Sequence, residues 1–166
     1  MRRGYGVADY LNRVNQLKRD IPGIALSTDI IVGYPSETEE EFQATLTLLK
    51  EVRFCRVFAF GYSPRPATPA AGLPDDIPSS EKKRRLHELF AVQEEISLEE
   101  NRALQGRTVP VLFDAASRMD PDCASGRTPC NRVVNVRGLE PAQVRGQIKP
   151  VLIASAGPHS LSGVPA

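Results

Sequence analysis

The segment from Ser27 to Phe42, STDIIVGYPSETEEEF, constrains the fold of this chain more than any other. The run Ile30–Val32 is typical of a short strand that is covered on both faces. Residues 33–35, Gly-Tyr-Pro, break this strand, and Ser36 is expected to begin a helix with a capping box to Glu39. Loops at the carboxyl ends of parallel strands are where α/β folds bind ligands. The segment therefore predicts either one wall of a ligand site or a tight turn without a ligand.

Regular elements are predicted on both sides of this segment. A helix with Asp9 near its start is expected to end at Pro22, and a second helix is expected from about residue 37 to residue 52. A strand over 56–60 follows. The helix–strand–helix–strand order is typical of a parallel α/β sheet. The residues expected on buried helix faces recur at helical spacing: Tyr10, Val14, Leu17 and Ile21 in the first helix, and Phe42, Leu46 and Leu49 in the second.

A proline-rich segment, GYSPRPATPAAGLPDDIP, separates these elements from a long helix. Its prolines exclude regular structure, so residues 61–78 are predicted to form an ordered, extended loop or a linker. The long helix is expected from about residue 80 to residue 104, with Gly106 as its stop signal. The charges of KKRR at 82–85 are balanced by later acids, and His87 is expected at the surface. The expected buried side of the helix comprises Leu86, Leu89, Phe90, Ile96 and Leu104.

The pattern changes after Gly106. Short apolar runs alternate with clusters of Gly, Pro, Asp and Ser, and no helical period continues. The runs lie at 109–113, 132–136, 147–154 and 160–164. Several short strands at close spacing predict a small, OB-like β-barrel, with a domain boundary near residue 105.

Composition and cysteine usage narrow the class of protein. The chain has 166 residues, of which 41% are apolar and 25% charged, as in soluble globular proteins. No apolar run approaches a membrane span, and the N-terminus lacks the core of a signal peptide, so we expect no membrane partner and a place in the cytoplasm or an organelle matrix. Cys55, Cys123 and Cys130 are widely spaced and form no CxxC pair. Both a disulfide framework and a self-contained metal site are therefore disfavoured.

The two parts of the chain carry different charge. Residues 1–105 contain 14 Lys and Arg against 16 Asp and Glu, whereas residues 106–166 contain 7 against 4. All but one of the basic residues in the second part are arginine, whose planar guanidinium suits phosphates and bases. The asymmetry indicates either a nucleic-acid partner or an ordinary solvated surface.

Five blocks, in this order, resemble the radical S-adenosylmethionine methylthiotransferases. They are MRRGY at 1–5, the segment 27–42, FGYSPRPATPA at 60–70, LPDDIPSSEKKRRL at 73–86, and SGRTPCNRVVNV at 125–136. The resemblance implies the last βα units of a partial radical SAM (β/α) barrel over 1–105 and a TRAM RNA-binding domain over 106–166. Arg65 and GRTPCNRVVNV are similar to the branch of the family that acts on tRNA.

The family resemblance also implies a reaction and its cofactors. That branch adds a methylthio group to carbon 2 of isopentenyladenosine 37 in tRNA, with S-adenosylmethionine and two 4Fe-4S clusters as cofactors. The implied partner is the tRNA anticodon stem-loop, and the full-length enzyme is expected to be a monomer. The alternatives are the sibling branch, which modifies a ribosomal-protein aspartate, and a stand-alone RNA-binding module.

This chain departs from the family in its cysteines. The CxxxCxxC motif that ligates the radical-generating cluster is absent, and scattered cysteines do not replace it. The sequence is therefore interpreted as a C-terminal portion of such an enzyme, with no catalytic or metal-ligating residue of its own. We expect this portion alone to bind no cluster and to be inactive.

The resemblance assigns cofactor residues one by one. Ile31, Val32 and Gly33 match the strand that packs on the adenine of S-adenosylmethionine, although the acid Glu37 comes four residues after Gly33 rather than three. Tyr62, Ser63 and Arg65 follow the next strand and so lie at the same end of the sheet. Arg65 is expected to pair with a carboxylate or an RNA phosphate, or with the local acid Asp75. Arg2 or Arg3 is expected at the methionyl end of the cofactor.

The predicted RNA contacts are cations and one amide of the second part. Cations bind phosphates, and amides read base edges. The one aromatic residue after residue 106, Phe113, is expected in the barrel core, so contacts to phosphate and shape are favoured over base stacking. The predicted RNA-binding residues are Arg107, Arg127, Asn131, Arg132 and Lys149.

Overall fold

The computed structural model describes residues 4–166, which form two compact units. The first unit ends at Gln93, and the second extends from Glu94 to Ala166. The long helix α3, Ser79–Arg102, passes from one to the other. No helix among residues 4–166 has the length and apolar character that crossing a membrane requires.

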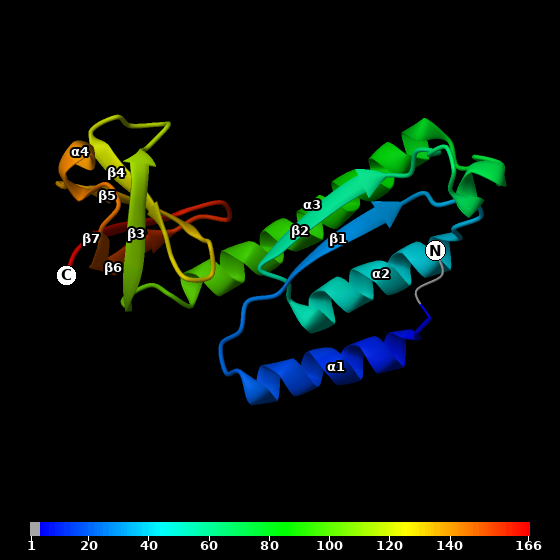
Figure 1. Ribbon diagram of the computed structural model, residues 1–166, viewed down its shortest axis with the longest axis horizontal. Helices are drawn as coiled ribbons and strands as arrows, with labels where there is room; N and C mark the ends of the chain where they lie inside the picture. Colours follow the sequence, from blue (N-terminus) through cyan, green and yellow to red (C-terminus); the bar gives the residue numbers. More distant parts are fainter. Residues whose placement is uncertain (1–3) are drawn as a thin grey trace. The chain divides into compact units, whose positions relative to one another are not determined.

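The first unit is built on two parallel strands, β1 (Ser27–Val32) and β2 (Arg56–Gly61) (Figure 1). Helix α1 (Val7–Asp20) precedes β1, and α2 (Glu39–Val52) connects the strands. Because α2 returns the chain to the start of a parallel neighbour, both strands end at the same edge of the sheet. The loop after β2 lies at that edge (Figure 1). It contains a short 3-10 helix, η1 (Pro69–Gly72), so the prediction that its prolines exclude regular structure is wrong over these four residues.

Only one face of this sheet is covered within the described chain. Val32 and Val57 are buried, together with Phe42, Leu46, Leu49 and Leu89 of the helices. On the other face, Ile31 pairs with Phe60, and these side chains are 36% and 57% exposed. The prediction that the first strand is covered on both faces is wrong here. Neighbouring residues of a strand point to opposite faces of the sheet. The β-branched run therefore places one residue, Val32, on the buried face and the next, Ile31, on the open face.

The start of α2 also differs from the prediction. Thr38, not Ser36, is the N-cap, and its hydroxyl accepts a hydrogen bond from the backbone N–H of Glu41. The Glu41 carboxylate accepts from the N–H of Thr38, which completes a capping box two residues later than predicted. Ser36 instead has φ of +68°, and its N–H donates to Asp76. The sequence offers two overlapping Ser/Thr-x-x-Glu patterns, and the turn geometry selects the second.

Three residues predicted on the buried faces of helices are exposed. Val14, Phe42, Leu46, Leu49, Leu89 and Ile96 are buried as predicted. By contrast, Leu17, Ile21 and Phe90 are 42%, 52% and 46% exposed. In α1 only a narrow stripe around Val14 is buried. Phe90 is rotated by about 100° around the axis of α3 from the buried Leu89, so it lies outside the buried face of that helix. His87 is exposed, as predicted.

The second unit is a closed barrel of five strands, which confirms the small β-barrel predicted after Gly106 (Figure 1). Its strands are β3 (Thr108–Ala116), β4 (Cys123–Arg127), β5 (Val133–Arg137), β6 (Ile148–Ala156) and β7 (Leu161–Pro165). Their order around the barrel is β3-β4-β5-β7-β6, and β5 and β7 form its one parallel pair among the described strands. The short helix α4, Pro141–Val144, lies between β5 and β6. Phe113 is in the barrel core at 1% exposure, as predicted.

Candidate functional site

The turn after β1 is fixed by a glycine that no other residue replaces easily. Gly33 has φ of +68°, and its N–H donates a hydrogen bond to the Glu37 carboxylate at 2.5 Å. A Cβ atom added to Gly33 would overlap the Cγ atom of Lys82 on α3. Both the backbone conformation and the contact with Lys82 therefore require glycine here.

A buried arginine ties this turn to α3. Arg85 is 4% exposed, and its guanidinium donates to the Glu37 carboxylate at 2.6 Å and to the Glu37 carbonyl at 3.1 Å. The same guanidinium donates to Glu81 and lies over the Phe42 ring, 5.4 Å from its centroid. Glu37 thus has a structural role: it links the Gly33 amide to Arg85.

A buried lysine ties the loop after β2 to the same helix. Lys82 is 8% exposed, and its ammonium group donates to the carbonyl oxygen of Tyr62 at 3.1 Å and to the Asp75 carboxylate. It also lies 5.4 Å from the centroid of the Tyr62 ring. The alternative in which Asp75 pairs with Arg65 is wrong, because Asp75 pairs with Lys82. Arg65 is exposed, and within residues 4–166 its guanidinium has no hydrogen bond or ion pair.

The structure places the other predicted cofactor residues in different environments. Ile31 lies on the open face of the sheet, whereas Val32 is fully buried and its carbonyl oxygen accepts from the Tyr62 N–H. Tyr62 is half-buried, and its hydroxyl donates a hydrogen bond to the carbonyl oxygen of Ala70. Its ring contacts the Tyr34 ring edge-on, with 5.3 Å between the ring centroids. Ser63 is exposed in the loop. Arg2 and Arg3 lie outside the described residues.

Lys82 and Arg85 are the residues that sequence reasoning missed at this end of the sheet. The KKRR run is interpreted from the sequence only as charge that later acids balance, yet Lys82 and Arg85 are buried and only the middle two residues are exposed. A signal was present, because positions 82, 85, 86 and 89 recur at the spacing of one helix face. Two cations on the buried face of a helix need acidic or carbonyl partners, and here they find them in the two loops.

The predicted RNA contacts of the barrel divide into exposed and structural residues. At the β4–β5 turn, Arg127 is 44% exposed and donates to the Asn131 side-chain oxygen at 3.1 Å. Asn131 has φ of +61°, which holds its amide at the tip of the turn. Arg107 is exposed just before β3. Lys149 is half-buried at the inward-facing position of β6 that pairs with the buried Val111.

Arg132 has mainly structural contacts. Its side chain is 16% exposed, donates to the side-chain oxygen of Asn101 and approaches Glu100 at 3.8 Å. Asn101 is itself buried and donates to the carbonyl oxygen of Gly157 at 2.7 Å. This network joins the last turn of α3 to β5 and to the β6–β7 turn.

Comparison with known proteins gives the barrel a family. Residues 102–165 match the TRAM domain family. A tRNA-2-methylthio-N(6)-dimethylallyladenosine synthase of Syntrophobacter fumaroxidans is 44% identical over 163 residues, covering 98% of this chain and 35% of that protein. The protein of the same name from Tropheryma whipplei is 45% identical over 167 residues, with the same coverage of 98% and 35%. The chain is homologous to these synthases over almost its whole length.

This homology confirms the resemblance to tRNA methylthiotransferases that the sequence blocks predict. The chain spans about a third of the length of the synthases it matches. The TRAM match contains all five predicted RNA-binding residues, but neither the match nor the homology tests their individual roles. No disulfide joins Cys55, Cys123 and Cys130, and their scattered positions do not fit the spacing of a cluster motif.

Proposed function

We propose that this chain is the C-terminal portion of a tRNA methylthiotransferase that adds a methylthio group to carbon 2 of isopentenyladenosine 37 by radical SAM chemistry. The observation that carries the proposal is the homology of 98% of the chain, at 44–45% identity, to synthases with this activity in their name. The name that these relatives carry supports tRNA over a ribosomal protein as the substrate, and the TRAM match is consistent with it. We keep the domain division near residue 105 as part of this proposal.

The first unit fits the last βα units of a radical SAM barrel. Its two strands are parallel, helices cover one face, and the other face bears Ile31, Phe58 and Phe60 with substantial exposure. In a (β/α) barrel the helices lie outside and the opposite strand faces point inward. We therefore propose that this open face contributes to the interior of the barrel.

The residues at the ends of β1 and β2 fit S-adenosylmethionine in part. Ile31 offers an exposed apolar side chain for the adenine, while Val32 and Gly33, which are both buried, would support it from the core. Tyr62, Ser63 and Arg65 line the loop at the same edge, and the unpaired Arg65 guanidinium suits a carboxylate or phosphate. S-adenosylmethionine bound beside a reduced 4Fe-4S cluster is the radical source in this chemistry. The ligands of both clusters would lie outside residues 1–166.

The second unit is proposed to bind the tRNA anticodon stem-loop. Arg107, Arg127 and Asn131 are exposed, and Lys149 is half-buried. Arg132 would contribute chiefly by holding the β4–β5 turn, because its guanidinium is engaged by Asn101 and Glu100. We further propose that the full-length enzyme is monomeric and acts in the cytoplasm or an organelle matrix.

The test expresses the complete reading frame around this chain in a bacterial strain that lacks its own methylthiotransferase. Nucleosides from digested tRNA are then analysed by liquid chromatography and mass spectrometry. We expect isopentenyladenosine to be converted to its 2-methylthio derivative. Unchanged isopentenyladenosine together with a methylthiolated ribosomal-protein aspartate would show that the sibling reaction is the correct one.

A further inference from the structure

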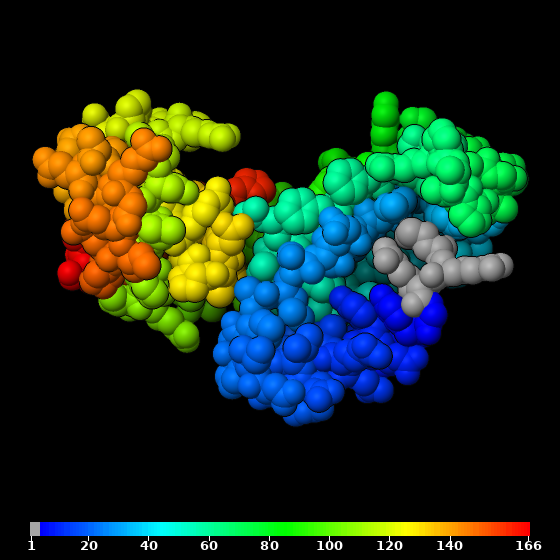
Figure 2. All heavy atoms as spheres, viewed as in Figure 1, coloured from blue at the N-terminus to red at the C-terminus, as the bar shows by residue number. Residues whose placement is uncertain are grey.

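A pocket lies on the wall of the barrel, between the end of β3 and α4, and none of its lining residues is among those predicted to contact RNA. It has a volume of about 270 Å³ and is lined by Asp114, Ala115, Ala116, Pro141, Ala142 and Arg145. Figure 2 shows the orange atoms of α4 beside the yellow-green atoms of β3. The volume is just below the roughly 300 Å³ at which pockets for drug-sized ligands begin. The pocket therefore has room for a single ring system.

The pocket is a consequence of how β3 and α4 are built. A register shift between Phe113 and Ala115 breaks the alternation of β3, so that the three residues 114–116 are all exposed. The end of α4 is tied to β3, because the Gly146 N–H donates to the Phe113 carbonyl at 2.7 Å and the Phe113 N–H donates to the Gln147 carbonyl at 3.0 Å. Backbone hydrogen bonds thus hold both walls of the pocket in place.

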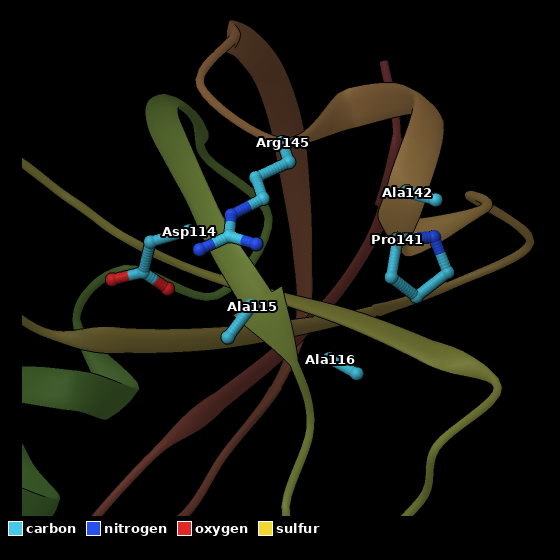
Figure 3. A pocket seen from close by; sticks show the side chains of 6 residues that line it. All are labelled: Asp114, Ala115, Ala116, Pro141, Ala142 and Arg145. Carbon is cyan, nitrogen blue, oxygen red and sulfur yellow. The ribbon is translucent and has the colours of Figure 1, made fainter.

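The pocket is lined by a small apolar surface and by two charged side chains, Asp114 and Arg145. Three alanines and Pro141 leave a shallow surface against which a flat ring can lie. Figure 3 shows the Arg145 side chain extending from the end of α4 across β3 toward Asp114. The Asp114 side chain is 52% exposed, so its carboxylate can accept hydrogen bonds from a ligand.

We propose that this pocket binds an unpaired guanine base of the RNA. Guanine is the RNA base whose Watson–Crick edge presents adjacent N–H donors, and these match the two oxygens of a carboxylate. Adenine, cytosine and uracil each present an acceptor next to a donor, and that acceptor would face the Asp114 carboxylate unfavourably. The planar guanidinium of Arg145 offers a stacking surface or a phosphate contact beside the base.

The pocket adjoins the surface already proposed to bind RNA. Arg127 lies between the two sites, since its Nε atom is 3.6 Å from the Asp114 carboxylate while its guanidinium also donates to Asn131. An exposed ion pair of this kind costs little to separate, so it does not close the pocket to a ligand. The inference rests on the proposed RNA-binding function of this unit and adds a base preference to it.

The test titrates the whole chain, labelled with ¹⁵N, with guanosine 5′-monophosphate and with the adenosine, cytidine and uridine monophosphates. We expect the guanosine nucleotide to shift the amide resonances of Ala115, Ala142 and Arg145 at a concentration at least about tenfold below the others. Asp114→Asn should remove this preference, whereas Glu95→Gln, the same change at an exposed acid of α3, should keep it. Arg145→Gln should weaken binding several-fold, and Arg102→Gln should not.

A second titration separates RNA from a free nucleotide as the source of the base. Single-stranded oligoadenylate that contains one guanosine should bind better than the same strand without it and should compete with the free guanosine nucleotide. Three results would each contradict guanine binding in this pocket: equal shifts with all four nucleotides, no shifts at all, or an unchanged preference in Asp114→Asn. A salt-dependent affinity for tRNA that survives such a result would leave the proposed RNA-binding function standing. Loss of tRNA binding with the guanosine preference intact would contradict that function instead.

Discussion

Gly33 illustrates what a single residue position does and does not reveal in a sequence. A glycine after a strand predicts a turn, and the structure has one there, with positive φ. The stronger constraint is the stem of Lys82, which occupies the space of any side chain at position 33. That contact joins residues 49 positions apart, so local patterns carry no trace of it. The same holds for Glu37 in the turn after β1, whose partner Arg85 lies on α3.

Replacing Gly33 by alanine should destabilise the first unit strongly. A left-handed backbone costs a non-glycine residue roughly 1–2 kcal/mol, and crowding against Lys82 adds to it, so we expect a loss of about 2–4 kcal/mol. All four tyrosines lie in the first unit, and the chain has no tryptophan, so tyrosine fluorescence during urea unfolding reports on this unit. Gly72→Ala is the matched control, because no atom lies within 4 Å of the added Cβ. Equal losses in both variants would contradict this account of Gly33.

Neighbouring arginines of α3 should differ sharply in their contribution to stability. Arg85→Met leaves the carboxylates of Glu37 and Glu81 without their buried partner, and breaking such pairs costs on the order of 3 kcal/mol. Arg84→Met removes an equal charge at a side chain that is 46% exposed. Exposed pairs contribute roughly 0–1 kcal/mol, so this change should have little effect. The same fluorescence-detected unfolding measures both, and similar values for the two variants would show that Arg85 does not hold the turn.

At the scale of elements, the ion pairs that Glu81 forms with Arg84 and Arg85 along α3 should make the first unit sensitive to acid. A hydrogen bond from Arg84 is the largest cause that lowers the pKa of Glu81 to about 2, from an ordinary value of 4.5. A carboxyl whose pKa is lower in the folded chain stabilises the fold above its unfolded pKa, and this stabilisation disappears as the pH falls through the folded pKa. Wild type should therefore lose more stability between about pH 4.5 and pH 2 than Glu81→Gln. Parallel pH profiles for the two proteins would exclude this role for Glu81.

Elements were predictable where their signal is local. Helices α1, α2 and α3 and four barrel strands follow from spacing and turn residues, which act within a few positions, whereas the one-turn helix α4 was not predicted. Strand β4, Cys123–Arg127, was missed because its small and polar residues lack a strand pattern. Its backbone pairs with β3 and β5, and Gly126 permits the close approach to Leu112, whose backbone a Cβ atom would overlap. The open face of β1 and β2 was not predictable either, since coverage depends on which elements pack against a strand.

At the scale of the whole molecule, the sequence predicts the kind of architecture better than its connections. The change of pattern at Gly106 and the excess of arginine beyond it indicate a small barrel with a basic surface. The parallel pairing of β5 with β7, which joins chain segments more than twenty residues apart, follows from no local rule. Among the site residues, the prediction for Arg132 used charge alone, and burial against Asn101 shows why charge is an incomplete guide.

The salt dependence of tRNA binding by residues 1–166 is the most direct test that this chain belongs to a tRNA-modifying enzyme. In filter-binding titrations across salt concentrations, the logarithm of the affinity should fall linearly with the logarithm of the salt concentration. Arg127→Gln should weaken binding and reduce the slope by about one, whereas Arg19→Gln, which removes an exposed cation of α1, should leave the slope unchanged. An affinity that does not vary with salt, or no binding at low salt, would contradict the account.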